Sequence, residues 1–178
     1  MIEVVPYDKE WAARFLELQR VLGDALKGVQ VVSIEHVGST SVPGLAAKPI
    51  TDIDVVVSRD DVVGASEALA RIGFVPRGEL GVPHRYAFFA PKTFFPTHTY
   101  VVVEGCLSLR NHIAVRDTLR SDETLRDEYG ALKLRLAESA RDIDQYVEQK
   151  SPILQRILAQ TGMTPEELLK IFHVNRVT

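Results

Sequence analysis

The chain has 178 residues, of which 46% are hydrophobic, 25% charged and 7% aromatic, a composition typical of a globular protein. The 21 Lys and Arg residues against 24 Asp and Glu give a net charge of −3, which argues against binding of long nucleic acid through a basic surface. No apolar run approaches the ~18–20 residues of a membrane span, and the acidic first residues do not resemble a signal peptide. Because Cys106 is the single cysteine, no internal disulfide can form. We therefore expect a cytoplasmic protein without a membrane partner.

Apolar periodicity, β-branched runs and helix-capping residues predict the elements along the chain. In chain order these are a helix over 9–26, strands over 31–37 and 49–57, a helix capped by Asp60 or Asp61 and ending at Gly73, strands over 74–76, 85–89 and 97–104, and helices near 108–119, 122–140, 142–160 and 164–172. This order predicts one α+β domain over residues 1–178. Its sheet-rich half covers about 1–105 and its helical half about 106–178.

The strand over 49–57 carries two acids, Asp52 and Asp54, within an apolar run. Because side chains alternate along a strand, both carboxylates project from one face, about 6.5–7 Å apart, while Ile53, Val55 and Val57 project from the other. Two such anions repel one another unless a positive group lies between them. A hard divalent cation such as Mg²⁺ is bound by one or two carboxylates together with water and phosphate oxygens. The alternative interpretation of an Asp-x-Asp strand is a solvated face.

A turn containing Gly38 and Ser39 precedes this strand, with twelve residues between Ser39 and Asp52. Gly38 permits close approach of a backbone, and Ser39 and the amides that follow it can bind phosphate if a helix begins there. The spacing of Gly38 and Gly44 does not match a P-loop, because five residues separate them and Leu45 follows. No nucleophile elbow of the Gly-x-Ser-x-Gly type is present, which disfavours a hydrolase.

The combination of Gly-Ser and a following Asp-x-Asp strand resembles the nucleotidyltransferase superfamily of the polymerase-β kind. More closely, residues 35–54, EHVGSTSVPGLAAKPITDID, resemble the signature of the GrpB family. The likeness extends over most of the chain, to Arg85, to the strand over 97–104 and to the helices that carry Arg116, Tyr129 with Lys133, and Tyr146 with Lys150. The resemblance implies a mixed β-sheet of the nucleotidyltransferase type, flanked by helices, with a helical C-terminal half.

For function, the resemblance implies transfer of a nucleotidyl group from a nucleoside triphosphate to a small acceptor. Asp52 and Asp54 would be the catalytic residues and would hold Mg²⁺ or Mn²⁺, while Gly38 and Ser39 would hold phosphates. Further candidates for binding the nucleotide are His36, Lys48, Arg85, His98, Arg116, Tyr129 and Lys133. Each of these has an ordinary structural interpretation: a packed strand histidine, a surface cation, or a helix-surface ion pair.

The chain departs from the superfamily at the strand over 97–104, which should supply a third carboxylate. His98, Tyr100, Val102 and Glu104 share one face, so no acid occupies the middle of the strand. Glu104, at its end, is the remaining candidate metal ligand, and the alternative is a solvated strand terminus. This departure favours a second hypothesis, a catalytically weak or inactive module of the same fold that binds a nucleotide or a CoA-like ligand.

Overall fold

The computed structural model describes residues 2–177, side chains as far as residue 172, and has the predicted order of elements. The helices are α1 (Glu10–Ala25), α2 (Val62–Arg71), α3 (Leu107–Ser121), α4 (Glu123–Ser139), α5 (Ile143–Leu158) and α6 (Pro165–Val177), and the 3-10 turn is η1 (Ser39–Ser41). The strands are β1 (Val31–Val37), β2 (Thr51–Val57), β3 (Val75–Gly78), β4 (Arg85–Phe89) and β5 (Thr97–Val103). The predicted elements are thus present, with boundaries that differ by a few residues.

The five strands form one mixed sheet in the order β1-β2-β5-β4-β3. Only β2 and β5 pair in parallel, and the other three pairings are antiparallel. The parallel register sets Asp52 beside His98 and Asp54 beside Tyr100. Since paired residues of parallel strands project from the same face, β5 presents His98 and Tyr100 next to the two carboxylates.

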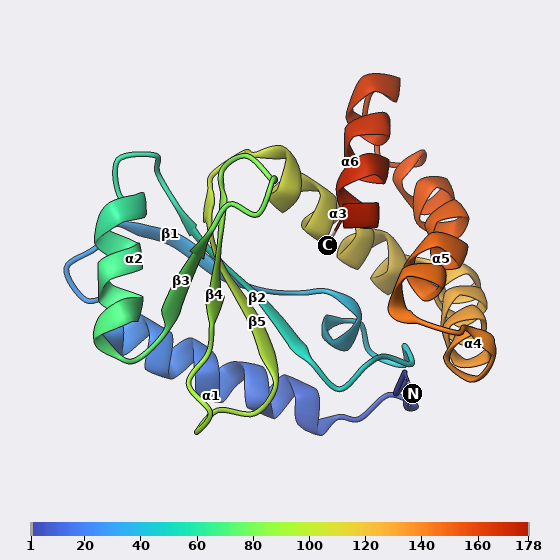
Figure 1. Ribbon diagram of the computed structural model, residues 1–178, viewed down its shortest axis with the longest axis horizontal. Helices are drawn as coiled ribbons and strands as arrows, with labels where there is room; N and C mark the ends of the chain where they lie inside the picture. The colour runs from blue at the N-terminus through green and yellow to red at the C-terminus, as the bar shows by residue number, and fades with distance from the viewer. Residues whose placement is uncertain (1, 178) are drawn as a thin grey trace.

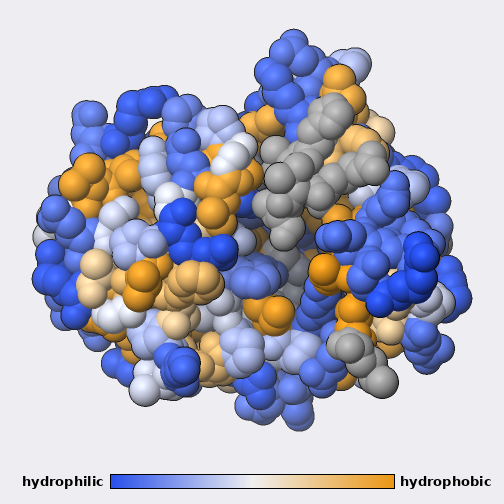
Figure 2. Space-filling view, viewed as in Figure 1, coloured by the Kyte–Doolittle hydropathy of each residue, from blue (hydrophilic) through white to orange (hydrophobic). Residues whose placement is uncertain are grey.

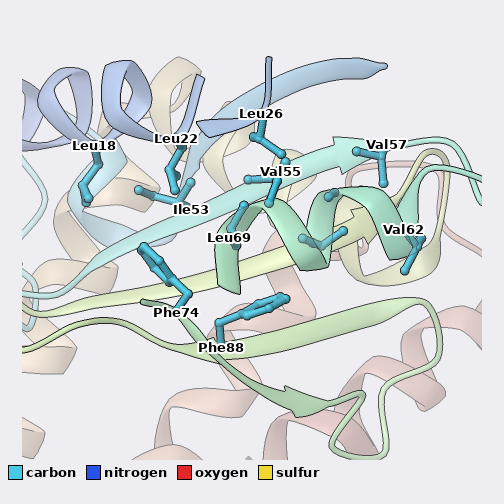
Figure 3. Close-up of a cluster of buried hydrophobic side chains, with 13 residues drawn as sticks. Leu18, Leu22, Leu26, Ile53, Val55, Val57, Val62, Leu69, Phe74 and Phe88 are labelled. Atoms are coloured by element: carbon cyan, nitrogen blue, oxygen red, sulfur yellow. The ribbon is translucent and has the colours of Figure 1, made fainter. Parts of the chain in front are cut away.

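One face of the sheet is covered by α1 and α2, and this layer is the main hydrophobic core (Figure 1). Ile53, Val55 and Val57 are fully buried there against Leu22 of α1 and Leu69 of α2 (Figure 3). Each such buried side chain contributes roughly 1.5–3 kcal/mol to stability. The predicted alternation of β2 is confirmed, because its odd-numbered apolar residues face this core and Asp52 and Asp54 face the opposite side.

The opposite side of the sheet is approached by α3, and α4, α5 and α6 pack around α3 and one another at the right of Figure 1. Asp122 caps α4 by accepting from the Leu125 amide at 2.9 Å, and Asp142 caps α5 by accepting from the Gln145 amide at 2.8 Å. The buried residues of α4 are spaced as one helical stripe, Leu125, Tyr129, Lys133 and Leu136, so a lysine occupies an apolar position.

The outer surface is ordinary for a globular protein. Figure 2 shows mostly hydrophilic residues over α4 and α5, with apolar residues over the strands β3 and β4, where Val75 and Phe89 are exposed. None of the helices within residues 2–177 is long and apolar enough to cross a membrane.

Candidate active site

The turn after β1 is shaped around the Asp52 side chain. Gly38 adopts a φ of 68°, and a Cβ atom added to it would lie 2.0 Å from Oδ2 of Asp52. Glycine is therefore required here both by backbone conformation and by the close approach of the carboxylate. The residues that follow form the single 3-10 turn η1, so the helical segment that begins at Ser39 is only three residues long.

Two arginines of α3 hold this turn in place. Arg120 donates to the Ser41 carbonyl through Nε at 3.0 Å and Nη2 at 2.7 Å. Arg116 donates to Glu35 at 2.7 Å, to the His36 carbonyl at 3.2 Å and to a neighbouring aspartate. Nε and Nη1 of Arg116 are thus bound by the protein, and this arginine holds the end of β1 that leads into the Gly38–Ser41 turn.

Each carboxylate of β2 is paired with a histidine. Oδ1 of Asp52 lies 2.8 Å from Nδ1 of His98, and Oδ2 of Asp54 lies 2.7 Å from Nδ1 of His112 on α3. The hydrogen bond to Asp52 raises the pKa of His98 despite opposing burial. Burial lowers the pKa of His112, but the charge and hydrogen bond of Asp54 outweigh it and raise that pKa overall. Asp54 is fully buried, and its Oδ1 has no hydrogen-bond partner among the described residues.

His36 takes no part in this pairing. Its ring stacks on Phe15 at 4.6 Å between centroids, and its Nε2 lies 3.1 Å from Oγ1 of Thr40. Burial lowers its pKa to about 4, so it is neutral at physiological pH. The sequence left two interpretations of His36, a nucleotide-binding residue or a packed strand histidine. This geometry supports the packed strand histidine.

A cavity of about 200 Å³ adjoins Ser39 and Asp52, and three lysines line it: Lys48, Lys133 and Lys150. We call it the lysine cavity. Lys48 and Lys150 lie over the Tyr146 ring at 5.0 and 5.5 Å, and Lys133 lies over the Tyr129 ring at 4.5 Å.

The amine of Lys133 is the least compensated cation of this cavity. The residue is 2% exposed, and Nζ has no hydrogen-bond partner in the described part of the chain. Burial, reinforced by Lys150, lowers its pKa well below 10.5, and burial with the charge of Lys48 lowers the pKa of Lys150 to about 8. Asp52 opposes both shifts. A buried cation without a partner is costly for a fold unless an anion joins it.

A larger space of about 590 Å³, the main cleft, opens between the sheet and α5. Lys48, Asp52, His98 and Lys150 line both the main cleft and the lysine cavity, whereas Arg85 and Tyr100 line only the main cleft of these two. The Arg85 guanidinium lies over the Tyr100 ring at 4.8 Å. Arg85 therefore shares the main cleft with Lys48 and Lys150 but does not line the lysine cavity.

Glu104 lies outside the site. It is exposed and follows the end of β5, where its amide donates to the Val57 carbonyl at 2.9 Å. Since Tyr100 is the β5 residue beside Asp54, Glu104 is four residues further along, about 13 Å away along the strand. Of the two interpretations, the solvated strand terminus agrees with this placement.

The sequence candidates brought together are Asp52, Asp54, Gly38, Ser39, Lys48, His98, Tyr129 and Lys133, with Arg85 at the edge of the main cleft. The candidate list missed His112 and Lys150. Lys150 was detectable, because it follows Tyr146 by one helical turn on the buried stripe of α5. His112 carries no comparable signal, since its partner Asp54 is 58 residues away.

Solved structures show that this architecture is the nucleotidyltransferase fold. The GLD-2/RNP-8 complex superposes with a TM-score of 0.56 at 18% identity, over 90% of this chain and 63% of that chain. Cid1 in complex with its short product ApU gives a TM-score of 0.54 at 15% identity, over 74% and 42%. The expected fold, a mixed sheet flanked by helices, is confirmed.

Within this fold, the comparisons also identify the family of the chain. The profile of the GrpB protein family matches residues 1–160, and the crystal structure of the conserved protein GrpB from Enterococcus faecalis gives a TM-score of 0.77 at 30% identity, over 90% of this chain and all of that one. The chain belongs to the GrpB family.

Similar sequences include uncharacterised members of this family. The UPF0157 protein YqkA of Bacillus subtilis is 32% identical over 151 residues, which are 84% of this chain and 44% of YqkA, so the chain spans less than half of that relative. A UPF0157 protein of Halalkalibacterium halodurans is 34% identical over 171 residues, 92% of this chain and 84% of the relative.

Proposed function

We propose that this protein transfers a nucleotidyl group from a nucleoside triphosphate to a small acceptor. The observation that carries the proposal is the unpartnered Lys133 amine in a cavity bordered by Ser39 and Asp52. A polyphosphate is the anion that would compensate three neighbouring lysines. A cavity of about 200 Å³ is too small for a whole nucleotide, so the nucleoside would extend into the main cleft.

In this proposal the lysines hold the β- and γ-phosphates, and the Gly38–Ser39 turn holds the α-phosphate beside Asp52. An acceptor hydroxyl oxygen bonds to the α-phosphorus while the bond from that phosphorus to the oxygen bridging to the β-phosphate breaks. The hydroxyl proton passes to water, and pyrophosphate leaves. The lysines stabilise the negative charge that develops on the leaving group, which is the main source of catalysis in such transfers.

The β2 carboxylates fit a hard divalent cation. The buried Oδ1 of Asp54 lacks a hydrogen-bond partner among the described residues, and Asp52 borders the open cleft. Among the side chains described, those of residues 2–172, no three His, Cys, Asp or Glu form a group that could hold a metal ion. Mg²⁺ suits such a site, because it keeps several waters and takes phosphate oxygens as ligands. When bound, Mg²⁺ or Mn²⁺ would neutralise charge on the transferring phosphate.

A second function, nucleotide or CoA-like ligand binding without turnover, is favoured by one observation. The β5 residues beside Asp52 and Asp54 are His98 and Tyr100, so β5 offers no third carboxylate there. The anion site would remain in such a protein while catalysis was weak.

Incubation with each labelled nucleoside triphosphate, Mg²⁺ or Mn²⁺ and a metabolite pool tests the proposal. We expect pyrophosphate release that is lost in Asp52→Asn and kept in the control Asp60→Asn, whose side chain is exposed outside the site. Saturable nucleotide binding without release would favour the second function. Absence of both would refute the two together.

A further inference from the structure

A third cavity, of about 480 Å³, adjoins the main cleft and plays no part in the function proposed above. The β3–β4 loop (81–84), the start of α3 and α6 enclose it, and we call it the side cavity. Its walls are largely apolar, from Val82, Pro83, Leu107 and Ile171. Its volume lies within the ~300–1,000 Å³ of pockets that hold small organic molecules.

Arg85 gives this cavity its chemical preference. The side chain is 6% exposed, its Nε is buried without a hydrogen-bond partner, and no ion pair of Arg85 is found among residues 2–172. Its contact with the Tyr100 ring at 4.8 Å does not replace a hydrogen-bond acceptor. A buried guanidinium of this kind favours a planar anion that accepts its hydrogen bonds, and a carboxylate fits best.

Asn111 supplies a second unsatisfied group on the wall of the side cavity. Its Oδ1 is buried and has no hydrogen-bond partner within the described residues. Because a carbonyl oxygen only accepts, it calls for a ligand group that donates, such as a hydroxyl or an amine. The side cavity thus offers apolar walls for the body of a ligand, Arg85 for an anionic group and Asn111 for a hydrogen-bond donor.

The side cavity is also continuous with the proposed reaction site. Arg85 and His112 line both it and the main cleft, and His112 is the residue paired with Asp54. The lysine cavity shares no lining residue with the side cavity. A ligand in the side cavity would therefore reach the proposed reaction site through the main cleft, past Arg85 and His112.

We propose that the side cavity binds the acceptor, and that the acceptor is a small organic acid with an apolar body, a carboxylate for Arg85 and a hydroxyl or amine near Asn111. This inference rests on the proposed nucleotidyl transfer for the role of the ligand. The existence of the binding site stands on the cavity and its two unpartnered groups.

The probe for this test is the fluorescent dye anilinonaphthalene sulfonate, which combines an apolar aromatic body with an anionic group. We expect one dye per chain, with affinity lowered about tenfold or more in Arg85→Met, since a hydrogen bond to a charged group contributes about 1.5–3 kcal/mol. Ile171→Phe, which fills the cavity, should weaken binding similarly. The control is Arg71→Met, because Arg71 is an exposed arginine at the end of α2 that lines none of the cavities described here.

Competition separates this site from the lysine cavity. Hexanoate should displace the dye at lower concentration than hexanol, and tripolyphosphate should leave it bound. The proposal is overturned if wild type binds no dye, if tripolyphosphate displaces it, if hexanol competes as well as hexanoate, or if neither Arg85→Met nor Ile171→Phe weakens binding. Should Arg85→Met fail to fold, Ile171→Phe decides. Tripolyphosphate that does not bind at all refutes the proposed function and leaves the dye result valid.

Discussion

Replacement of Lys133 by methionine tests whether this lysine binds a ligand or has a structural role. Methionine matches the length of the lysine stem and removes the amine, which is buried and lacks a hydrogen-bond partner among the described residues. We expect Lys133→Met to be more stable than wild type and weaker in binding polyphosphate. Opposite changes in stability and binding are expected where a protein keeps a costly group for function.

The two magnitudes follow from the surroundings of the amine. Burial and the neighbouring Lys150 lower the pKa of Lys133 well below 10.5, so at pH 7 the fold bears either an unpaired cation or the cost of deprotonating it. Replacing buried charges by apolar groups stabilises by about 1–3 kcal/mol, or roughly 2–12 °C in melting temperature. Loss of a buried charge contact to phosphate costs about 2–3 kcal/mol, about 30- to 150-fold in affinity.

Calorimetric titration with tripolyphosphate and thermal denaturation measure the two effects on the same samples. The control is Lys92→Met, because that lysine is exposed and lines none of the cavities described here. If Lys133→Met were less stable than wild type and bound tripolyphosphate equally well, the lysine would be structural and the reasoning refuted.

Three further predictions concern other parts of the site. Gly38→Ala should lower the free energy of unfolding by about 1–3 kcal/mol more than Gly81→Ala, and urea denaturation measures the difference. Both positions have positive φ, but of the two only a Cβ atom added at Gly38 would meet a neighbour, the Asp52 carboxylate. Tripolyphosphate affinity should fall as the pH rises through about 8, by up to about tenfold per unit, because the pKa of Lys150 is about 8 and the protonated amine binds. In titrations of Lys150→Gln this dependence should be weaker. His112→Leu should destabilise by about 3–5 kcal/mol in urea, since it leaves a buried carboxylate unpaired.

Each of these predictions has a contrary result. Equal costs for the two glycine variants would mean that the close approach to the carboxylate is relieved without strain. Affinity that rises with pH would mean that the neutral amine binds. A His112→Leu variant as stable as wild type would show that the buried carboxylate is satisfied by another group.

The part of the site predictable from sequence is the part set by local geometry. Alternation along β2 depends only on the strand itself, so the common face of Asp52 and Asp54 follows from their spacing. The Gly-Ser turn was equally visible, because glycine is needed for positive φ. The short helical segment that could follow Ser39 is a single 3-10 turn, and Arg120 binds the Ser41 carbonyl at its end.

The rest of the site depends on how distant elements meet. His112 reaches Asp54 only because α3 packs on the sheet, and Lys133 lines the same cavity as Ser39 only because α4 packs against α3. Glu104 was a candidate because it is the one acid on the strand over 97–104. The parallel register, which no single strand contains, places that residue beyond Val57.

Magnesium-dependent binding of a nucleoside triphosphate tests the central claim most directly. An analogue with a methylene group between the α- and β-phosphates cannot be turned over, so its calorimetric titration reports binding alone. With Mg²⁺ present, wild type should bind it at least about tenfold tighter than without, and Asp52→Asn should show no such gain. If the analogue does not bind, or binds equally well with and without Mg²⁺ and in Asp52→Asn, the proposed metal-dependent nucleotide site is contradicted.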